Sequence, residues 1–198
     1  MMSYQFIFDL DGTITKKDML PEIAKQNGRE DKIIASIKKT AEGNLPFCEG
    51  FSERIQLLKD VPISRCHEII HNVPLHEGIV SFIRENRDRC VVLTGNLDVW
   101  VAPLLNSLGA EWYSSKASLM NGEVNALAFI MDKGSHVRDI AYPYVAVGNG
   151  NNDIEMLRKA DVGIAFGNVR NPSSAILSVA THLIYEEKTL CKMLKQLL

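Results

Sequence analysis

The stretch FIFDLDGTIT, residues 6–15, constrains the fold more than any other part of the chain. Its apolar residues 6–8 follow one another without alternation, which is the pattern of a strand covered on both faces. A hairpin strand with one face in water would alternate apolar and polar residues, and the segment that follows offers no partner strand. We therefore interpret this stretch as a buried strand of a parallel sheet that ends at two carboxylates, Asp9 and Asp11.

Further strand candidates alternate along the chain with helical patterns. Residues 78–87, 99–108 and 154–160 carry apolar residues at helical spacing, and Gly109 stands where a left-handed helix end is expected. Strands that alternate with helices pair in parallel through right-handed crossovers. The sequence therefore predicts an α/β fold with a Rossmann-like, doubly wound parallel sheet, whose sites form beyond the carboxyl ends of the strands. The later strand candidates are residues 90–93, 144–147, 162–165 and 182–185.

One region breaks this alternation. From about residue 20 to residue 71 apolar positions recur every three or four residues, and no convincing strand is found. The simplest account is a small helical cap inserted after the first strand. We predict a core domain made of residues 1–15 and 75–198, and a cap domain made of residues 16–74.

Composition narrows the function classes. The formal net charge is −2 with Lys and Arg scattered along the chain, so the basic stripe that non-specific nucleic-acid binding requires is missing. No stretch has the apolar length that spans a bilayer, and the start MMSYQF lacks the regions of a secretion signal. The four cysteines are far apart and form no C-x-x-C pair, so buried, reduced thiols are expected. We expect a cytoplasmic protein that recognises a small molecule, not a nucleic acid or a membrane; the sequence leaves the oligomeric state open.

Polar residues follow several of the predicted strands, at the point where each strand ends. Asp9 and Asp11 follow the first strand, Thr94 begins the triplet TGN after the second, and GNGNND follows residue 147. Lys133 lies in a further loop, MDKGSHV. Each signal alone is typical of an ordinary turn or a surface lysine. Their shared placement at one edge of the sheet predicts a site there.

These side chains suit phosphoester chemistry. Two carboxylates two residues apart can offer oxygen ligands to Mg²⁺, which attracts phosphate. Thr94 can donate to phosphate oxygens, and the Lys133 ammonium can neutralise charge that grows during phosphoryl transfer. One Asp can then attack phosphorus while the other moves the proton. The spacing excludes a calcium-binding EF-hand, a dinucleotide fingerprint and a Walker loop.

The ordered set DLDGT, LTGN, DKG and GNGNND resembles the four motifs of the haloacid dehalogenase superfamily. Within it the chain resembles the phosphoserine phosphatases nearly end to end, including EGNLPF, ERIQLLKDVP and VPLHEG. The resemblance implies a nucleophile that forms an aspartyl-phosphate, a second Asp that acts as acid and base, and Mg²⁺ as cofactor. The two carboxylates at the end of the buried strand are then expected to be the nucleophile and its proton shuttle.

Carried over residue by residue, the resemblance assigns a role to each motif position. Asp9 is the expected nucleophile, and Asp11 the acid that protonates the leaving alkoxide and then activates water. The resemblance places Mg²⁺ on a carboxylate oxygen of Asp9, the backbone carbonyl of Asp11 and Asn149, with Asp153 supporting the metal from behind its ligands. The expected phosphate contacts are Thr94, Gly95, Lys133 and Asn152, and the expected substrate contacts in the cap are Arg54, for a carboxylate, Phe47 and Asp18.

Two positions depart from the family pattern. Asn149 stands where the family usually has an Asp ligand, so the metal site carries one negative charge fewer and we expect Asn149→Asp to tighten Mg²⁺ activation. Asp18 stands where phosphoserine phosphatases have a Glu that recognises the substrate ammonium, and it is one methylene shorter. For Arg54, position alone is equally compatible with a surface arginine on an amphipathic helix.

Three functions remain open on these grounds. The leading one is Mg²⁺-dependent hydrolysis of O-phosphoserine or a similar small phosphorylated amino acid, with the cap as a lid. Asp18, and Asn96 where the family often has Gly, keep open a different small phosphoester or transfer of the phosphoryl group to another alcohol. The third is a catalytically weakened phosphate-binding module, which the retained nucleophile and proton shuttle disfavour.

Overall fold

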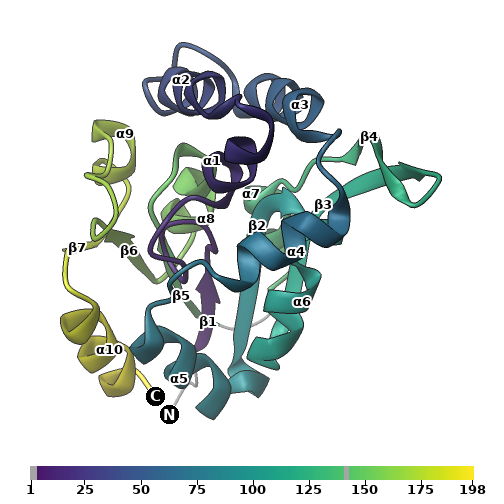
Figure 1. The fold of residues 1–198 in the computed structure, drawn as a ribbon. Helices are drawn as coiled ribbons and strands as arrows, with labels where there is room; N and C mark the ends of the chain where they lie inside the picture. Colours follow the sequence, from purple (N-terminus) through teal and green to yellow (C-terminus); the bar gives the residue numbers. More distant parts are fainter. Residues whose placement is uncertain (1–3, 141–142) are drawn as a thin grey trace.

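The first strand lies at the centre of the sheet, as the sequence predicts. The computed structural model describes residues 4–140 and 143–198 (Figure 1). In it β1 (Gln5–Phe8) pairs in parallel with β2 on one side and β5 on the other, so that Phe6 lies opposite both Cys90 and Val145. The seven-stranded sheet has the order β4-β3-β2-β1-β5-β6-β7. Its other strands are β2 (Cys90–Leu97), β3 (Glu111–Met120), β4 (Glu123–Phe129), β5 (Tyr144–Gly148), β6 (Val162–Phe166) and β7 (His182–Ile184).

Both faces of β1 are covered, which explains its unbroken apolar run. Phe6 and Phe8 point into one hydrophobic cluster, whereas Ile7 points into a second cluster on the opposite face. The first cluster contains buried residues of α5 (Glu77–Glu85), α6 (Asp98–Leu108) and α10 (Glu187–Gln196). The second contains residues of α8 (Ile154–Arg158) and α9 (Ser174–Leu177). Helices on two faces of a mainly parallel sheet confirm the predicted Rossmann-like α/β fold.

The sequence analysis missed a hairpin at one edge of the sheet. Strand β3 runs parallel to β2 but pairs antiparallel with β4, so the edge of the sheet is not parallel. The two strands are joined by Asn121 and Gly122, with φ of 55° and 81°. Positive φ at both positions is what a two-residue hairpin turn requires, and Asn-Gly is its preferred sequence.

Four helices fill the region that was predicted to be helical. They are α1 (Met19–Ala24), α2 (Glu30–Ala41), α3 (Phe47–Leu58) and α4 (Ile63–His71). Figure 1 shows α2 and α3 over one end of the sheet, with the β3–β4 hairpin projecting beneath α3. The carboxylate of Glu123 in β4 accepts a hydrogen bond of 3.0 Å from the backbone N–H of Ile63, the first residue of α4. The hairpin therefore helps to hold this helical region.

The chain enters and leaves the helical region at one narrow neck. Thr15 and Leu75 form an isolated antiparallel bridge there. Beside it the Lys16 N–H donates to the carbonyl of Pro74 at 2.7 Å, and the His76 N–H donates to the carbonyl of Ile14 at 2.9 Å. The predicted domain boundaries, 15/16 and 74/75, fall at this bridge. The division into a core domain and a cap domain stays a prediction.

Several smaller expectations can be compared with the structure. Helix α6 ends at Gly109 with φ of 75°, as predicted. Strand β2 is longer than predicted and runs to Leu97, so Thr94 lies within the strand and not in the loop after it. All four cysteines are free, but Cys48 is exposed and not buried as expected. Among the described residues no helix is long and apolar enough to cross a membrane.

Candidate active site

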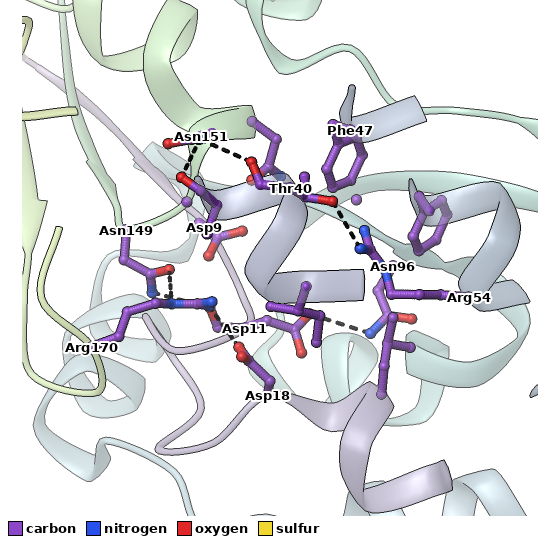
Figure 2. Close-up of a pocket in the computed structure, with 17 residues that line it drawn as sticks. Asp9, Asp11, Asp18, Thr40, Phe47, Arg54, Asn96, Asn149, Asn151 and Arg170 are labelled. Atoms are coloured by element: carbon purple, nitrogen blue, oxygen red, sulfur yellow. Dashed lines mark hydrogen bonds and ion pairs between the residues drawn. The ribbon is translucent and has the colours of Figure 1, made fainter. Parts of the chain in front are cut away.

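A pocket lies between the carboxyl ends of the central strands and the helices of residues 19–58 (Figure 2). It contains eight of the residues that the sequence singled out, together with others that it did not. The other three predicted site residues, Thr94, Lys133 and Asp153, are buried and are not among the residues that line the pocket. The pocket is lined by Asp9, Asp11, Asp18, Leu20, Ile37, Thr40, Ala41, Phe47, Phe51, Arg54, Gly95, Asn96, Asn149, Gly150, Asn151, Asn152 and Arg170.

Asp9 is held by a buried lysine. It directly follows β1, and its residue is 5% exposed. One carboxylate oxygen accepts from the Lys133 ammonium, and the other accepts from the Thr13 hydroxyl at 3.3 Å. The same ammonium donates to Oδ1 of Asp153 at 2.6 Å. Lys133 therefore joins two carboxylates that come from distant parts of the chain.

Backbone groups fix Asp153 in place. Its second oxygen, Oδ2, accepts from the backbone N–H groups of Asn149 at 2.9 Å and Gly150 at 2.8 Å. The turn after β5 is tight at Gly148, where a Cβ atom would come within 2.6 Å of the Asp153 carboxylate. The glycines of GNGNND therefore serve close packing around an acidic side chain, which explains their place in the loop.

Burial and neighbouring charges set the protonation of this cluster. Burial, with the charge of Asp153, raises the pKa of Asp9 to about 7, and the Lys133 ammonium opposes that rise. Burial would lower the pKa of Lys133, but the carboxylates of Asp153 and Asp9 raise it above its ordinary value. Lys133 is therefore a permanent cation at neutral pH and favours the ionised form of Asp9.

Asp11 lies in a different environment from Asp9. Its two oxygens accept from the Met19 N–H at 2.9 Å and from Nδ2 of Asn96 at 3.2 Å. Burial raises the pKa of Asp11 to about 6, and the charge of Asp18 adds to the rise. The pKa of each acid lies near neutrality, but their partners differ: Asp9 is bound to the Lys133 ammonium, whereas the Asp11 carboxylate accepts from the uncharged N–H groups of Met19 and Asn96. The two acids are thereby distinguished.

Arg170 lies among the predicted metal ligands. The sequence analysis did not single it out. Its Nε donates to Oδ1 of Asn149 at 3.1 Å, and its Nη2 donates to the Asp18 carboxylate at 2.6 Å and to the Asp11 carbonyl at 3.5 Å. Nδ2 of Asn149 in turn donates to the Asp11 carbonyl at 3.0 Å and to the Thr13 hydroxyl at 3.1 Å. Asp18 therefore lines the pocket but is paired with an arginine.

The donor atoms of the predicted metal site are of the type that a hard cation binds. A carboxylate of Asp9, the carbonyl of Asp11 and the amide oxygen of Asn149 are all oxygen ligands of the type that Mg²⁺ prefers. Hydrogen bonds link Asn149 directly to Asp11, so these groups lie together as predicted. Among the residues that the structure describes, no group of three His, Cys, Asp or Glu side chains forms a metal site.

Arg54 is buried beneath two phenylalanine rings. The residue is 3% exposed, so the alternative of a surface arginine is wrong. Its guanidinium lies 5.8 Å from the ring centre of Phe47 and 5.9 Å from that of Phe51. Nη1 donates to the hydroxyls of Ser36 and Thr40, but Nε has no hydrogen-bond partner among the described residues. An unpaired donor on a buried cation that lines the pocket is suited to bind an anion.

Of the remaining predicted contacts, Gly95 and Asn152 line the pocket and Thr94 is buried. Gly95 packs so closely against Phe47 that a Cβ would lie 2.6 Å from the Phe47 Cζ atom. Asn152 lines the pocket beside it. The Thr94 hydroxyl accepts from the Asn96 N–H at 3.1 Å, which leaves its own hydrogen free to be donated.

Three pocket contributors were given no role by the sequence analysis. Arg170 follows β6, a strand that was predicted, and its position beyond that strand's carboxyl end was the available signal. Thr40 closes the pocket from α2, where it is one polar residue among many. Asn151 links the two sides, because its Nδ2 donates to the carbonyls of Thr40 and Ala41. No sequence pattern pointed to Thr40, whereas Asn151 lies in the loop GNGNND, which the sequence singles out without giving this residue a role.

Comparison with known families identifies the class of this site. A model of haloacid dehalogenase-like hydrolases matches residues 6–158, and a second model with the same description matches residues 131–189. The chain belongs to the haloacid dehalogenase-like hydrolases. Within them it is a phosphatase of the phosphoserine phosphatase-like kind.

The similarity to individual proteins extends over nearly the whole chain. The phosphoserine phosphatase of Methanocaldococcus jannaschii is 29% identical over 96% of this chain and 95% of its own length. That of Archaeoglobus fulgidus is 26% identical over 91% of this chain, which spans 56% of the relative's length. A solved phosphoserine phosphatase with bound substrate is 26% identical, with a TM-score of 0.84 over 99% of each chain. A phospho-aspartyl intermediate analogue of phosphoserine phosphatase has a TM-score of 0.83 at 27% identity, covering 98% of this chain and 99% of the other. These similarities support phosphoester hydrolysis through an aspartyl-phosphate.

Proposed function

We propose that this chain hydrolyses O-phosphoserine, or a similar small phosphorylated amino acid, in a Mg²⁺-dependent reaction with Asp9 as the nucleophile. One observation carries the proposal: Asp9 faces the pocket with the Lys133 ammonium bound to its carboxylate and Asp11 two residues away. The relatives named phosphoserine phosphatase support the choice of substrate class.

In the first step, one carboxylate oxygen of Asp9 attacks phosphorus. A bond forms between that oxygen and phosphorus, and the ester P–O bond breaks. Asp11, whose pKa is raised to about 6, gives its proton to the leaving alkoxide, so that serine departs as the neutral alcohol. Lys133 neutralises part of the negative charge that grows on the phosphoryl oxygens. The product left in the pocket is an aspartyl-phosphate on Asp9.

In the second step, Asp11 acts in the opposite direction. It is now ionised and accepts a proton from water, whose oxygen attacks phosphorus. The bond between phosphorus and the Asp9 oxygen breaks, which releases inorganic phosphate and restores the carboxylate. Thr94, Gly95 and Asn152 are the groups proposed to hold the phosphoryl oxygens through this exchange.

The proposed cation ligands are a carboxylate oxygen of Asp9, the carbonyl of Asp11 and the amide of Asn149, with Asp153 behind them. Mg²⁺ in such a site supplies positive charge to the phosphate oxygens and reduces the repulsion between phosphate and the carboxylates. Asp153 acts through the loop, because it binds the N–H groups of Asn149 and Gly150 and so positions the ligand.

The substrate end of the pocket is proposed to hold an organic anion. Arg54 has an unpaired Nε, and its charge is shielded from water by Phe47 and Phe51. A guanidinium in these surroundings can bond both oxygens of a carboxylate. The Asp18 carboxylate lies in the same pocket, but its bond to Arg170 means that a substrate ammonium must compete for it.

The first test is phosphate release from O-phospho-L-serine beside a panel of small phosphoesters, with Mg²⁺ and with chelator. We expect a Mg²⁺-dependent preference for phosphoserine that disappears in Asp9→Asn. Arg54→Met serves as the matched pocket variant, and we expect it to raise KM for phosphoserine more than KM for an ester without a carboxylate. A different preferred ester would refute the substrate assignment and leave the chemistry of Asp9 in place.

Two other functions are separated by the same assay. Transfer of the phosphoryl group to another alcohol would be seen when glycerol or serine is added as acceptor. Phosphorylated glycerol or phosphorylated serine would then form in place of inorganic phosphate. A phosphate-binding module would release no phosphate from any ester, and Asp9→Asn would then change nothing. The retained contact between Lys133 and Asp9 favours the enzyme.

A further inference from the structure

Arg170 places a fixed positive charge among the groups that are proposed to bind the metal. Figure 2 shows its guanidinium between Asn149 and Asp18, on the side of the pocket where Asp11 lies. Three of its hydrogen bonds go to the Asn149 amide oxygen, the Asp18 carboxylate and the Asp11 carbonyl. Two of these acceptors, on Asn149 and Asp11, are oxygens that the proposed function assigns to the cation.

The arginine also determines which way the Asn149 amide faces. A guanidinium Nε–H can only donate, so the amide must turn its oxygen toward Arg170. The NH₂ group of Asn149 then points to the Asp11 carbonyl, at 3.0 Å. With this orientation the amide donates to the Asp11 carbonyl and to the Thr13 hydroxyl, and it offers no lone pair on that side.

The opposite orientation is incompatible with Arg170 in its present place. An amide oxygen turned toward a cation beside the Asp11 carbonyl would bring the Asn149 NH₂ group against the Arg170 Nε–H. Two donors would then face each other in a half-buried site, where an unpaired polar group is costly. A like charge would also lie within hydrogen-bonding range of the metal's own ligands.

Asp18 holds the guanidinium in this position. The ion pair between Arg170 Nη2 and Asp18 Oδ1 is 2.6 Å long, and both side chains are partly shielded, with 30% and 24% exposure. Arginine stays protonated throughout the range of pH in which proteins fold. The positive charge is therefore present at any working pH, and it is built into the chain.

We propose that Arg170 is a resident cation that competes with the divalent metal for the oxygens of Asn149 and Asp11. In the metal-free protein the guanidinium occupies these oxygens. Binding of the metal displaces the guanidinium and lets the Asn149 amide rotate into the opposite orientation, with its oxygen toward the metal. The proposal rests on the proposed function for the location of the metal, but it does not depend on which phosphoester is the substrate.

Competition of this kind weakens the apparent binding of the metal. The apparent association constant equals the intrinsic one multiplied by the fraction of metal-free molecules in which Arg170 is already displaced. Removing the guanidinium should therefore tighten metal binding. We expect Arg170→Met, which keeps an apolar stem of similar length, to bind Mn²⁺ at least about tenfold more tightly than the unchanged chain. Free Mn²⁺ is counted by electron paramagnetic resonance in metal-free protein, so that no substrate and no turnover are needed.

Two control variants separate displacement from a general change in charge. Arg54→Met removes another guanidinium from the same pocket, but Arg54 contacts Ser36 and Thr40 and not the proposed ligands. Arg158→Met removes an exposed arginine that pairs with Glu155. We expect a small effect for Arg54→Met and none for Arg158→Met. Equal tightening in Arg54→Met and Arg170→Met would assign the effect to charge alone and overturn the proposal, as would unchanged or weaker Mn²⁺ binding in Arg170→Met.

A second measurement follows the Arg170 side chain in the unchanged chain and uses a variant only to assign its signal. In metal-free protein the Arg170 Nε–H is hydrogen-bonded and should exchange slowly with solvent. Its ¹H–¹⁵N signal, assigned by its loss in Arg170→Lys, should move and lose that protection when Mg²⁺ saturates the site. A signal that keeps its position and protection would refute displacement. Because neither measurement involves a phosphoester, failure of the substrate assignment and failure of this proposal are distinguishable.

Discussion

Replacing Lys133 by Met tests how much of the fold depends on the buried charges at the pocket floor. The Lys133 side chain is 0% exposed, and its ammonium contacts both Asp9 and Asp153. After the change, Asp153 retains its two backbone N–H donors, whereas the Asp9 carboxylate retains, among the described residues, only the Thr13 hydroxyl at 3.3 Å. One buried carboxylate thus loses its compensating charge, which typically costs about 3–5 kcal/mol of the free energy of unfolding.

The loss should depend on pH in a defined direction. In the unchanged chain the pKa of Asp9 is about 7, and the ammonium is one of the groups that lower it. Without Lys133 the pKa of Asp9 rises further. When the folded pKa of a carboxyl is raised, the free energy of unfolding falls as the pH rises from the unfolded pKa to the folded pKa, by about 1.4 kcal/mol for each pH unit between them. The full loss is present above the folded pKa. The difference between the two proteins should therefore be largest near about pH 9 and shrink toward about pH 6.

Urea unfolding followed by circular dichroism at these two values of pH measures the effect. Lys38→Met is the control, because Lys38 is 74% exposed and its pair with Glu42 is 3.8 Å long, so little change is expected at either pH. A loss for Lys133→Met that is the same at both values of pH would refute the reasoning. So would a loss below about 1 kcal/mol near pH 9, because the charge would then not be buried without a partner.

Three further changes test other parts of the structure. Gly163→Ala places a Cβ 2.7 Å from the backbone carbonyl of Leu157, which cannot easily move, and should lower the free energy of unfolding in urea by about 1–3 kcal/mol. Trp100→Ala empties a fully buried site and should lower it by about 3–5 kcal/mol; a loss below about 1 kcal/mol would mean that the site collapses. Burial opposes ionisation of Glu187, but its contacts with the His76 ring and a backbone N–H lower its pKa. The stability that Glu187 adds is present above its unfolded pKa of about 4.5 and lost as the pH falls through the lowered value, so melting temperatures of Glu187→Gln and the unchanged chain should converge below that pH.

The sequence predicted those parts of the fold in which local pattern and tertiary burial agree. Residues 6–8 are apolar without alternation because both faces of β1 are covered, and one hydrophobic cluster takes Phe6 while the other takes Ile7. The helical spacing of residues 99–108 and the glycine that follows them gave α6 and its left-handed end. The carboxyl ends of β1, β2 and β5 are neighbours in the sheet, which is why polar residues from three separate loops meet.

The failures have physical reasons of the same kind. Strand β3 is followed by Asn121 and Gly122, a strong hairpin signal, but its mixed residues EWYSSKASLM resemble a loop because the strand lies near the sheet edge and much of it is exposed. Thr94 was placed in a loop because Thr-Gly is typical of turns, whereas β2 continues through it with a shift in register. Arg170 was missed because a lone arginine in a polar loop gives no spacing to read.

The narrow neck at Thr15 and Leu75 has a consequence for how such a protein can diversify. The two chain segments that pass through the neck lie side by side, because Thr15 and Leu75 pair with each other. If the segment between them were removed, its two ends would already be close, and a short turn would join them at little entropic cost. Segments of other lengths and sequences can be accommodated between the same two points without changing the spacing of β1 and β2. Such an exchange would also remove Asp18 and the Met19 N–H, which contact Arg170 and Asp11, so a transplanted segment has to supply equivalent partners for both.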